Sequence, residues 1–224
     1  MRLILVRHGE TEHNRRKLTL GRADVPLNER GRAQARAVAA SFTRAPVAIY
    51  ASPLSRAFEM ARVIGAATGV DVAIEPDLVE MDVGEMEHLT GAELRERYPE
   101  FLRSWLSNGA ADARMPGGET LREVAADARM PGGETLREVQ DRTWPALERM
   151  RAAHPDGEVV AVTHNFVILT AVCRALNLPL SEFRRIRHGL ASRTVIDMRD
   201  GGATLIQLND HAHLLAAGLS GDPT

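Results

Sequence analysis

Two arginines and two histidines follow the ends of three apolar runs that have the character of buried β-strands. They are Arg7 and His8 after residues 3–6, Arg56 shortly after Ser52 and the run 47–51, and His164 after residues 158–163. In an open α/β sheet, ligands bind beyond the carboxyl ends of the parallel strands, so we expect these side chains to meet at one rim. No acidic residue stands directly beside them, and the group suits a tetrahedral dianion such as phosphate.

The order Arg7-His8-Gly9 indicates how such a rim could do chemistry. Positive charge beside a histidine lowers its pKa, so His8 is expected to be neutral at pH 7 and nucleophilic toward phosphorus. In-line attack would give a phosphohistidine, with Arg7, Arg56 and His164 balancing the charge on the phosphoryl oxygens. Gly9 allows the backbone to approach closely. The arginines replace a metal here, so we predict neither a metal nor another cofactor.

A leaving alkoxide also needs a proton, and a carboxylic acid with a raised pKa is the economical donor. The segment DLVEMDVGEMEH supplies five candidates. They are Asp77, Glu80, Asp82, Glu85 and Glu87. Spacing alone does not choose among them.

Apolar runs alternate with helical patterns along most of the chain, as in a parallel sheet with helices on both faces. The expected strands are 3–6, 47–52, 70–75, 158–164, 193–199 and 203–208, and the expected helices are 31–45, 55–68 and 166–176. The turn at residues 200–202 suits a hairpin between the last two strands. We therefore predict an α/β fold of three α/β/α layers, with a mostly parallel sheet, one antiparallel edge strand and a helical insert over the active site.

A polar segment rich in Gly and Pro, at about residues 77–150, is predicted to form that insert within a single domain spanning all 224 residues. It contains AADARMPGGETLREV at 110–124 and again, unchanged, at 125–139. Two short identical units indicate a tandem duplication rather than a solenoid. Each copy has a Pro-Gly-Gly stop and then a capping box, Thr120–Glu123 or Thr135–Glu138. We expect one copy to pack natively, and the other to loop out or add a helical segment at the surface.

Other reactive side chains have simpler interpretations. A second Arg-His-Gly, at 187–189, precedes a strand-like run, so we place His188 at the wrong end of a strand for the rim and interpret it as structural. His211 and His213 lack a third ligand at metal-site spacing. Cys173, the one cysteine, lies in an apolar run and is expected to be a core residue.

Composition limits the partners. The formal net charge is −2, the hydrophobic content is 44%, and no stretch approaches the length of a membrane span. We therefore expect a cytoplasmic protein, monomer or homodimer, whose partner is a small-molecule phosphate ester rather than a nucleic acid or a membrane.

Together the motifs resemble the histidine phosphatase superfamily, the phosphoglycerate mutase-like proteins, over nearly the whole chain. The matching segments are Leu5-Val6-Arg7-His8-Gly9-Glu10-Thr11-x-x-Asn14, Gly21-Arg22-x-Asp24, Ser52-Pro53-Leu54-x-Arg56-Ala57, Leu78-x-Glu80-x-x-x-Gly84-x-x-Glu87 and Val162-Thr163-His164. The resemblance implies that His8 is phosphorylated and selects Glu80 as the acid. It also implies that Asn14 contacts the phosphoryl group and that Arg22 touches the substrate.

Two positions depart from the family pattern. Asn165 stands where a glycine commonly follows the second histidine, and His88 stands where a glycine commonly follows Glu87. Both are expected near the mouth of the site, where they would affect the shape of the substrate that fits. We include Asn165 among the expected substrate-binding residues.

The leading hypothesis is a metal-independent phosphomonoesterase that acts on small phosphorylated metabolites. A 2,3-bisphosphoglycerate-dependent phosphoglycerate mutase is the first alternative, although the longer insert with aromatic and proline-rich motifs that such mutases carry is not found. A non-catalytic phosphate-binding module is the second alternative. A binding module needs neither the nucleophile His8 nor the acid Glu80, so their presence favours an enzyme.

Overall fold

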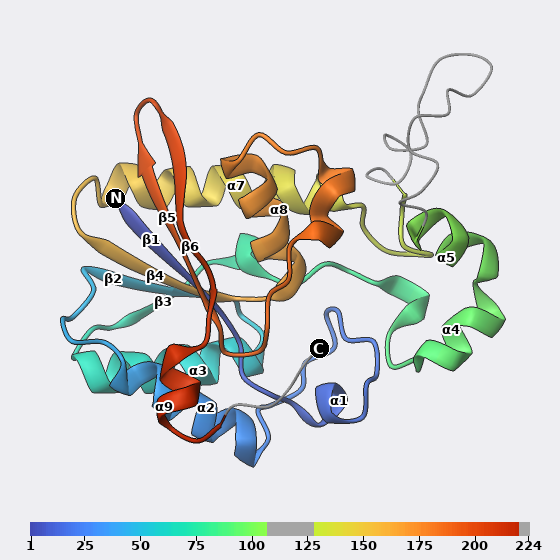
Figure 1. The fold of residues 1–224 in the computed structure, drawn as a ribbon, viewed down its shortest axis with the longest axis horizontal. Helices are drawn as coiled ribbons and strands as arrows, with labels where there is room; N and C mark the ends of the chain where they lie inside the picture. The colour runs from blue at the N-terminus through green and yellow to red at the C-terminus, as the bar shows by residue number, and fades with distance from the viewer. Residues whose placement is uncertain (107–127, 220–224) are drawn as a thin grey trace.

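One six-stranded sheet organises the chain, whose computed structural model describes residues 1–106 and 128–219. The strands are β1 (Arg2–Arg7), β2 (Ala48–Ala51), β3 (Val72–Ile74), β4 (Glu158–Thr163), β5 (Arg193–Arg199) and β6 (Gly202–Asp210). They lie in the order β3-β2-β4-β1-β5-β6, visible in Figure 1. The first four are parallel to one another, whereas β5 runs antiparallel to both β1 and β6. The predicted mostly parallel sheet with an antiparallel edge is confirmed.

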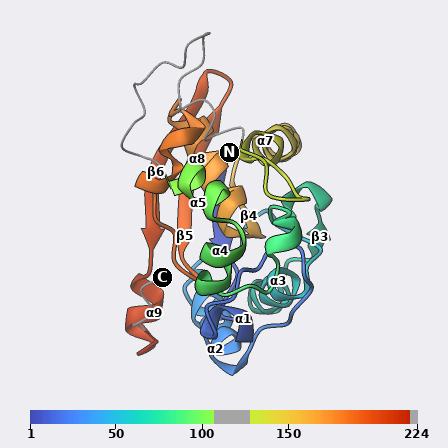
Figure 2. The same cartoon turned by 90° about the vertical axis from the view of Figure 1, so that its right-hand side faces the viewer.

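Helices cover both faces of this sheet (Figures 1 and 2). The α-helices are α1 (Glu12–Arg15), α2 (Glu29–Ala40), α3 (Ser55–Thr68), α4 (Gly91–Arg97), α5 (Pro99–Leu106), α7 (Leu136–Ala153), α8 (Asn165–Ala175) and α9 (Ala212–Ala216), with 3₁₀ turns η1 (Pro76–Leu78), η2 (Gly84–Met86) and η3 (Leu180–Arg185). Helices α2 and α3 pack on one face, and α7 and α8 on the other. None of the described helices is long and apolar enough to cross a membrane.

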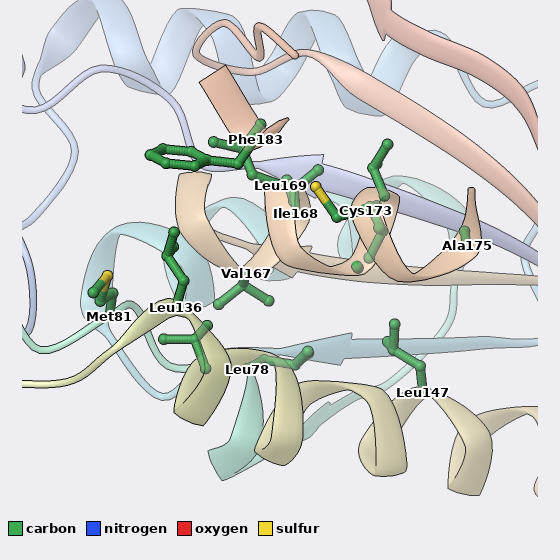
Figure 3. Packing of buried hydrophobic residues seen from close by; sticks show 14 of the residues in the cluster. Leu78, Met81, Leu136, Leu147, Val167, Ile168, Leu169, Cys173, Ala175 and Phe183 are labelled. Atoms are coloured by element: carbon green, nitrogen blue, oxygen red, sulfur yellow. The ribbon is translucent and has the colours of Figure 1, made fainter. Parts of the chain in front are cut away.

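Burial on both faces explains the unbroken apolar run of β1. Leu3 and Leu5 join the core beneath α7 and α8, whereas Ile4 and Val6 join the core beneath α2 and α3. Because successive strand side chains point to opposite faces, a central strand in a sandwiched sheet must be apolar at every position. Figure 3 shows the first core, where Leu136 of α7 packs with Val167 of α8.

Helix α5 is tied to the sheet by aromatic packing. Trp105 is 8% exposed, and its ring lies 5.2 Å from the ring of Phe183 and 6.2 Å from that of Phe166, centroid to centroid. Arg184 stacks over the Trp105 ring, with 5.1 Å between its guanidinium carbon and the ring centroid. Such aromatic pairs add about 0.5–1.5 kcal/mol to plain area burial, so this cluster holds α5 against α8 and η3.

The described part of the second repeat copy, residues 128–139, packs against the rest of the protein. Its Pro131-Gly132-Gly133 turn docks on the loop after η1: the Glu134 N–H donates to the Asp82 carbonyl at 2.9 Å, and the Glu85 N–H donates to the Pro131 carbonyl at 2.9 Å. Thr135 then starts α7 with a capping box. The first copy, 110–124, lies outside the described residues.

Removing one copy is therefore expected to leave the fold intact. Deleting residues 110–124 gives the same sequence as deleting 125–139, because the copies are identical. The remaining copy still forms the docked turn and the start of α7, so we expect an unchanged Tm and near-UV circular dichroism spectrum. A clearly lower Tm would contradict this assignment.

A substitution in the shortened chain tests whether the remaining copy still forms the docked turn. A Cβ added at Gly133 would lie 2.3 Å from the carbonyl oxygen of Asp82, a backbone atom that cannot move aside cheaply. Gly133→Ala is therefore expected to destabilise the shortened chain by about 1–3 kcal/mol, measured by urea denaturation.

Candidate active site

The three strand ends identified from the sequence meet at one rim. The His8 N–H donates to the Thr163 carbonyl at 3.0 Å, which joins the end of β1 to the end of β4. The Ser52 N–H donates to the Val162 carbonyl at 3.0 Å, which joins β2 to the same place. The rings of His8 and His164 lie 5.2 Å apart, centroid to centroid. The parallel order β2-β4-β1 thus brings these side chains together.

His8 is held as a neutral imidazole with a defined tautomer. Its Nδ1 lies 2.7 Å from the Gly9 carbonyl oxygen, which can only accept, so Nδ1 carries the proton and Nε2 keeps its lone pair. The side chain is buried, and this burial lowers the pKa of His8 well below its ordinary value. The positive charges of Arg56 and Arg7 lower the pKa further. Nε2 is therefore unprotonated at neutral pH, and its lone pair is available.

Arg56, in the first turn of α3, is fully buried and firmly oriented. Its Nη1 donates to the Ala23 carbonyl at 2.8 Å and its Nη2 to the Gly21 carbonyl at 2.6 Å. Its Nε is buried without a hydrogen-bond partner. Burial lowers the pKa of Arg56, and the charges of Glu80 and Glu87 oppose that shift. Two of the five guanidinium N–H groups fix the side chain, and the others are left for an anion.

Glu87 fixes the loop that orients Arg56. Its Oε1 accepts from the Gly21 N–H at 2.6 Å, and its Oε2 accepts from the Ala23 N–H at 3.1 Å. The peptide groups of the same two residues thus donate to Glu87 and accept from Arg56. From the sequence, Glu87 was one of five equivalent acid candidates. Its role in positioning the loop depends on a contact with Gly21, which lies 66 positions away in the sequence.

A glutamine at position 87 is expected to weaken phosphate binding. In Glu87→Gln, the side-chain NH₂ group would face the N–H of either Gly21 or Ala23, and a donor cannot bond to a donor. The loop then loses one charge-assisted hydrogen bond, and Arg56 is no longer held in a fixed orientation. We expect Kd for inorganic phosphate to rise about tenfold, equivalent to about 1.4 kcal/mol, in titration calorimetry. Glu85→Gln is the matched control, because Glu85 is exposed and contacts Tyr98 instead. Equal Kd values in both variants would contradict the role of Glu87.

Arg7 is oriented by the loop that precedes β5. Its Nη1 donates to the His188 carbonyl, and its Nε is buried without a partner. Burial lowers the pKa of Arg7 to about 10, so it stays charged at neutral pH. Arg7 therefore resembles Arg56: main-chain carbonyls orient the guanidinium, and N–H groups remain for a ligand.

The prediction that His188 lies at the wrong end of a strand was wrong. Strand β5 runs antiparallel to β1, with Arg193 opposite Val6, so the residues before β5 reach the rim where β1 ends. The His188 ring contacts the hydroxyl groups of Thr194, at 2.7 Å, and Ser192, at 2.8 Å. Burial lowers its pKa to about 3. These contacts agree with the predicted structural role of His188. They hold in place the loop in which the main-chain carbonyl of His188 accepts from Arg7.

His164 has one nitrogen fixed and one without a partner. Its Nε2 lies 2.7 Å from the Ser52 hydroxyl oxygen, whereas its Nδ1 is buried and makes no hydrogen bond. The Leu54 N–H donates to that hydroxyl at 3.3 Å, which leaves the hydroxyl proton free to point at Nε2. A tautomer with the proton on Nδ1 would then present an N–H donor to a ligand. Burial lowers the pKa of His164 well below its ordinary value.

Among the five candidates, the charge of Glu80 acts on both Arg7 and Arg56. Its oxygens accept from the Asn165 N–H at 3.0 Å, the Phe166 N–H at 3.2 Å and the Met81 N–H at 2.8 Å. Burial raises the pKa of Glu80, while the Met81 N–H and the charges of Arg56 and Arg7 oppose that rise. Glu80 is thus a buried acid beside the start of α8 whose pKa lies above its ordinary value.

The other candidates have contacts elsewhere. Asp77 pairs with Arg149 at 2.7 Å, Asp82 accepts from the Gly84 N–H at 2.8 Å, and Glu85 accepts from the Tyr98 hydroxyl at 3.0 Å. These contacts tie Asp77 to α7, tie Glu85 to the end of α4, and hold Asp82 within its own loop. The contacts in the structure therefore distinguish the five carboxyl groups from one another, which sequence spacing could not do.

The remaining expected substrate contacts have these positions. Asn14 accepts from the Thr11 N–H at 3.1 Å and from the Thr11 hydroxyl at 2.9 Å, and it thereby completes the capping box in which Thr11 caps α1. The side chain of Arg22 is 41% exposed and donates to Glu134 at 2.8 Å. Asn165 is half-buried and starts α8. Substrate contact by these three stays a prediction.

The buried imidazoles are expected to make the fold sensitive to acid. Since His8, His164 and His188 have lowered pKa values, the unfolded chain takes up protons near pH 6.5 that the folded chain refuses, and stability falls as the pH drops. We expect a loss of about 1 kcal/mol for each, about 3 kcal/mol together, between pH 6.5 and 5.5.

Urea denaturation in phosphate-free buffer measures this. The raised pKa of Glu80 acts in the opposite direction and offsets part of the loss. An equal free energy of unfolding at pH 6.5 and 5.5 would contradict the buried, neutral state of the three imidazoles.

Comparison with known proteins agrees with this geometry. A model of the histidine phosphatase superfamily (branch 1) matches residues 3–129 and 125–211, and the overlap of the two ranges falls within the duplication. Phosphoserine phosphatase 1 of Hydrogenobacter thermophilus is 32% identical over 215 residues, covering 96% of this chain and 94% of that protein. Phosphoglycerate mutase-like protein 4 of Arabidopsis thaliana is 34% identical over 233 residues, covering 99% and 93%.

A solved structure gives the same result for the fold. A mycobacterial glucosyl-3-phosphoglycerate phosphatase superposes with a TM-score of 0.79 at 28% identity, covering 94% of this chain and 99% of that one. The sheet order, the rim of histidines and arginines and these matches agree. The chain belongs to the histidine phosphatase superfamily.

Proposed function

We propose that the protein is a metal-independent phosphomonoesterase that acts on small phosphorylated metabolites through a phosphohistidine on His8. One observation carries this proposal. Three buried nitrogens, Arg7 Nε, Arg56 Nε and His164 Nδ1, make no hydrogen bond within the described part of the chain. Unpaired buried donors are costly, and a phosphoryl group beside His8 would satisfy all three.

The first half-reaction transfers the phosphoryl group to the enzyme. His8 Nε2 attacks phosphorus and forms a P–N bond as the ester P–O bond breaks. Arg7 and Arg56 stabilise the charge on the phosphoryl oxygens, and Glu80 gives its proton to the leaving alkoxide. The products are phospho-His8, the free alcohol and the Glu80 carboxylate.

The second half-reaction restores the enzyme. The Glu80 carboxylate takes a proton from a water molecule as the water oxygen attacks phosphorus. The P–N bond breaks, and inorganic phosphate and neutral His8 result. The arginines supply the positive charge that a metal ion supplies in other phosphatases, so EDTA is expected to leave turnover unchanged.

The relatives and the polar side chains at the rim support a small polar phosphate ester as the substrate. The named relatives include a phosphoserine phosphatase and a glucosyl-3-phosphoglycerate phosphatase. Arg22 and Asn165 add polar groups that suit a small polar ester. A screen of phosphate esters with purified protein, compared by kcat/KM, tests this, and hydrolysis of none of them would refute the proposal.

Mutase activity is the second candidate, because one relative is named a phosphoglycerate mutase-like protein. Incubation with 3-phosphoglycerate and a trace of 2,3-bisphosphoglycerate separates the two functions. Phosphate release faster than 2-phosphoglycerate formation supports the phosphatase, and the reverse order supports the mutase.

A further inference from the structure

One peptide group, between His188 and Gly189, joins Arg7 to the end of β6. Its carbonyl, that of His188, accepts from Nη1 of Arg7. Its N–H, that of Gly189, donates to Oδ1 of Asn209 at 2.7 Å. A main-chain N–H can only donate, so the side-chain oxygen of Asn209 must face it. The two bonds lie at opposite ends of one planar trans peptide unit, so the Asn209 side chain sets the direction in which the His188 carbonyl points.

Asn209 is itself held in place near the end of β6. Its φ is +56°, in the left-handed region that asparagine tolerates better than most residues. Its N–H donates to the Thr194 hydroxyl at 3.2 Å, and that hydroxyl lies 2.7 Å from Nε2 of His188. Because the Thr194 oxygen accepts from Asn209, its own proton is free to point at His188. The amide that holds the peptide group thus extends from a fixed backbone.

Main-chain hydrogen bonds also hold the loop before β5 against β1. The Ala191 N–H donates to the His8 carbonyl at 3.0 Å, and the Arg7 N–H donates to the Ser192 carbonyl at 3.1 Å. These bonds fix where the loop lies, because they act on its last residues. The bond from Asn209 acts instead on the peptide group that accepts from Arg7, so it fixes the orientation of that acceptor.

We propose that Asn209 is a positioning residue for Arg7, which it orients toward the phosphoryl group of the substrate. The inference rests on the phosphate-binding role of Arg7 in the proposed function. The buried Nε of Arg7 makes no hydrogen bond to any residue that the structure describes. The direction of the guanidinium therefore decides whether this N–H meets a phosphoryl oxygen. Asn209 acts on Arg7 as Glu87 acts on Arg56, since each holds the main chain that holds an arginine.

Phosphate binding by Asn209→Gly tests the proposal without using catalysis. Glycine suits the positive φ, but it leaves the Gly189 N–H without its acceptor. We expect Kd for inorganic phosphate to rise about tenfold in a phosphorus NMR titration. Asn209→Asp keeps an acceptor oxygen and should bind phosphate as the wild-type protein does. Asn177→Gly is the matched control, because Asn177 also has a positive φ, of +53°, but is exposed beyond the carboxyl end of α8.

A double-mutant cycle shows whether Asn209 acts through Arg7. In an Arg7→Ala background, Asn209→Gly should leave the remaining phosphate affinity unchanged. A general loosening of the rim would instead weaken phosphate binding equally in both backgrounds. Circular dichroism checks that each variant folds.

Four results would overturn the proposal. They are no phosphate binding by the wild-type protein, an unchanged Kd in Asn209→Gly, an equal rise in Kd in Asn209→Asp, and an equal rise in the Arg7→Ala background. Ester hydrolysis by the wild-type protein together with an unchanged Kd in Asn209→Gly would refute the role of Asn209 alone. No hydrolysis, together with the tenfold rise in Kd and its loss in the Arg7→Ala background, would refute the phosphatase proposal alone.

Discussion

His8→Ala is expected to abolish turnover of p-nitrophenyl phosphate, with a loss of about a thousandfold or more, the scale on which removal of a nucleophile acts. The alanine variant has no atom that can bond to phosphorus, although Arg7, Arg56 and His164 remain. The fold should persist, because the side chain makes one hydrogen bond, to the neighbouring Gly9 carbonyl.

The measurement is kcat with EDTA present, together with Tm. His154→Ala is the matched control, because His154 follows the carboxyl end of α7 and contacts Tyr50 rather than the rim. Full activity in His8→Ala would refute nucleophilic catalysis by this residue. Retained phosphate binding with no turnover is the expected result.

Glu80→Gln is expected to slow the first half-reaction more for a leaving group that must be protonated than for one that leaves as a stable anion. An ester with an alkyl leaving group should lose about 10²–10⁴-fold, the usual contribution of a general acid. p-Nitrophenolate hardly needs protonation, so its release in the first turnover should be almost unchanged. Later turnovers should be slow, because the carboxylate that activates water is also gone.

Stopped-flow measurement of the p-nitrophenolate burst separates these steps. An alkyl phosphate followed under the same conditions gives the comparison. Equal losses for both esters in the first turnover would assign the acid to another residue. Glu85→Gln controls for the loss of a nearby negative charge, since Glu85 contacts Tyr98.

Much of the rim could be predicted because it follows from local sequence and one rule of topology. The apolar runs that end at Arg7, Ala51 and Thr163 identify strands β1, β2 and β4. Once these strands are parallel, their carboxyl ends must share an edge of the sheet. No long-range contact has to be known for that inference.

The error at His188 shows where this rule stops. A hairpin was expected at the end of the chain, but the neighbour of its first strand was not specified by local sequence. Pairing of β5 with β1, antiparallel, reverses which end of β5 reaches the rim. Strand order depends on packing of the whole sheet, which periodicity does not encode.

Contacts between distant polar groups were also beyond prediction. Glu87 binds the loop at Gly21 and Ala23, and the Glu80 carboxylate binds the start of α8. Each bond depends on how the loop after η1 lies over the rim. Carboxyl residues in that loop are equivalent by spacing, so only the folded chain distinguishes the acid from its neighbours.

Trapping the phosphoenzyme tests nucleophilic catalysis by His8 most directly. Glu80→Gln mixed with p-nitrophenyl phosphate should accumulate phosphohistidine, because phosphorylation proceeds and hydrolysis is slow. Rapid quenching at alkaline pH, proteolysis and peptide fragmentation by mass spectrometry locate the phosphoryl group. We expect a stoichiometric, acid-labile phosphoryl group on His8, absent from the His8→Ala, Glu80→Gln double variant. A phosphoryl group on another residue, or p-nitrophenolate release with no phosphoenzyme, would contradict this role of His8.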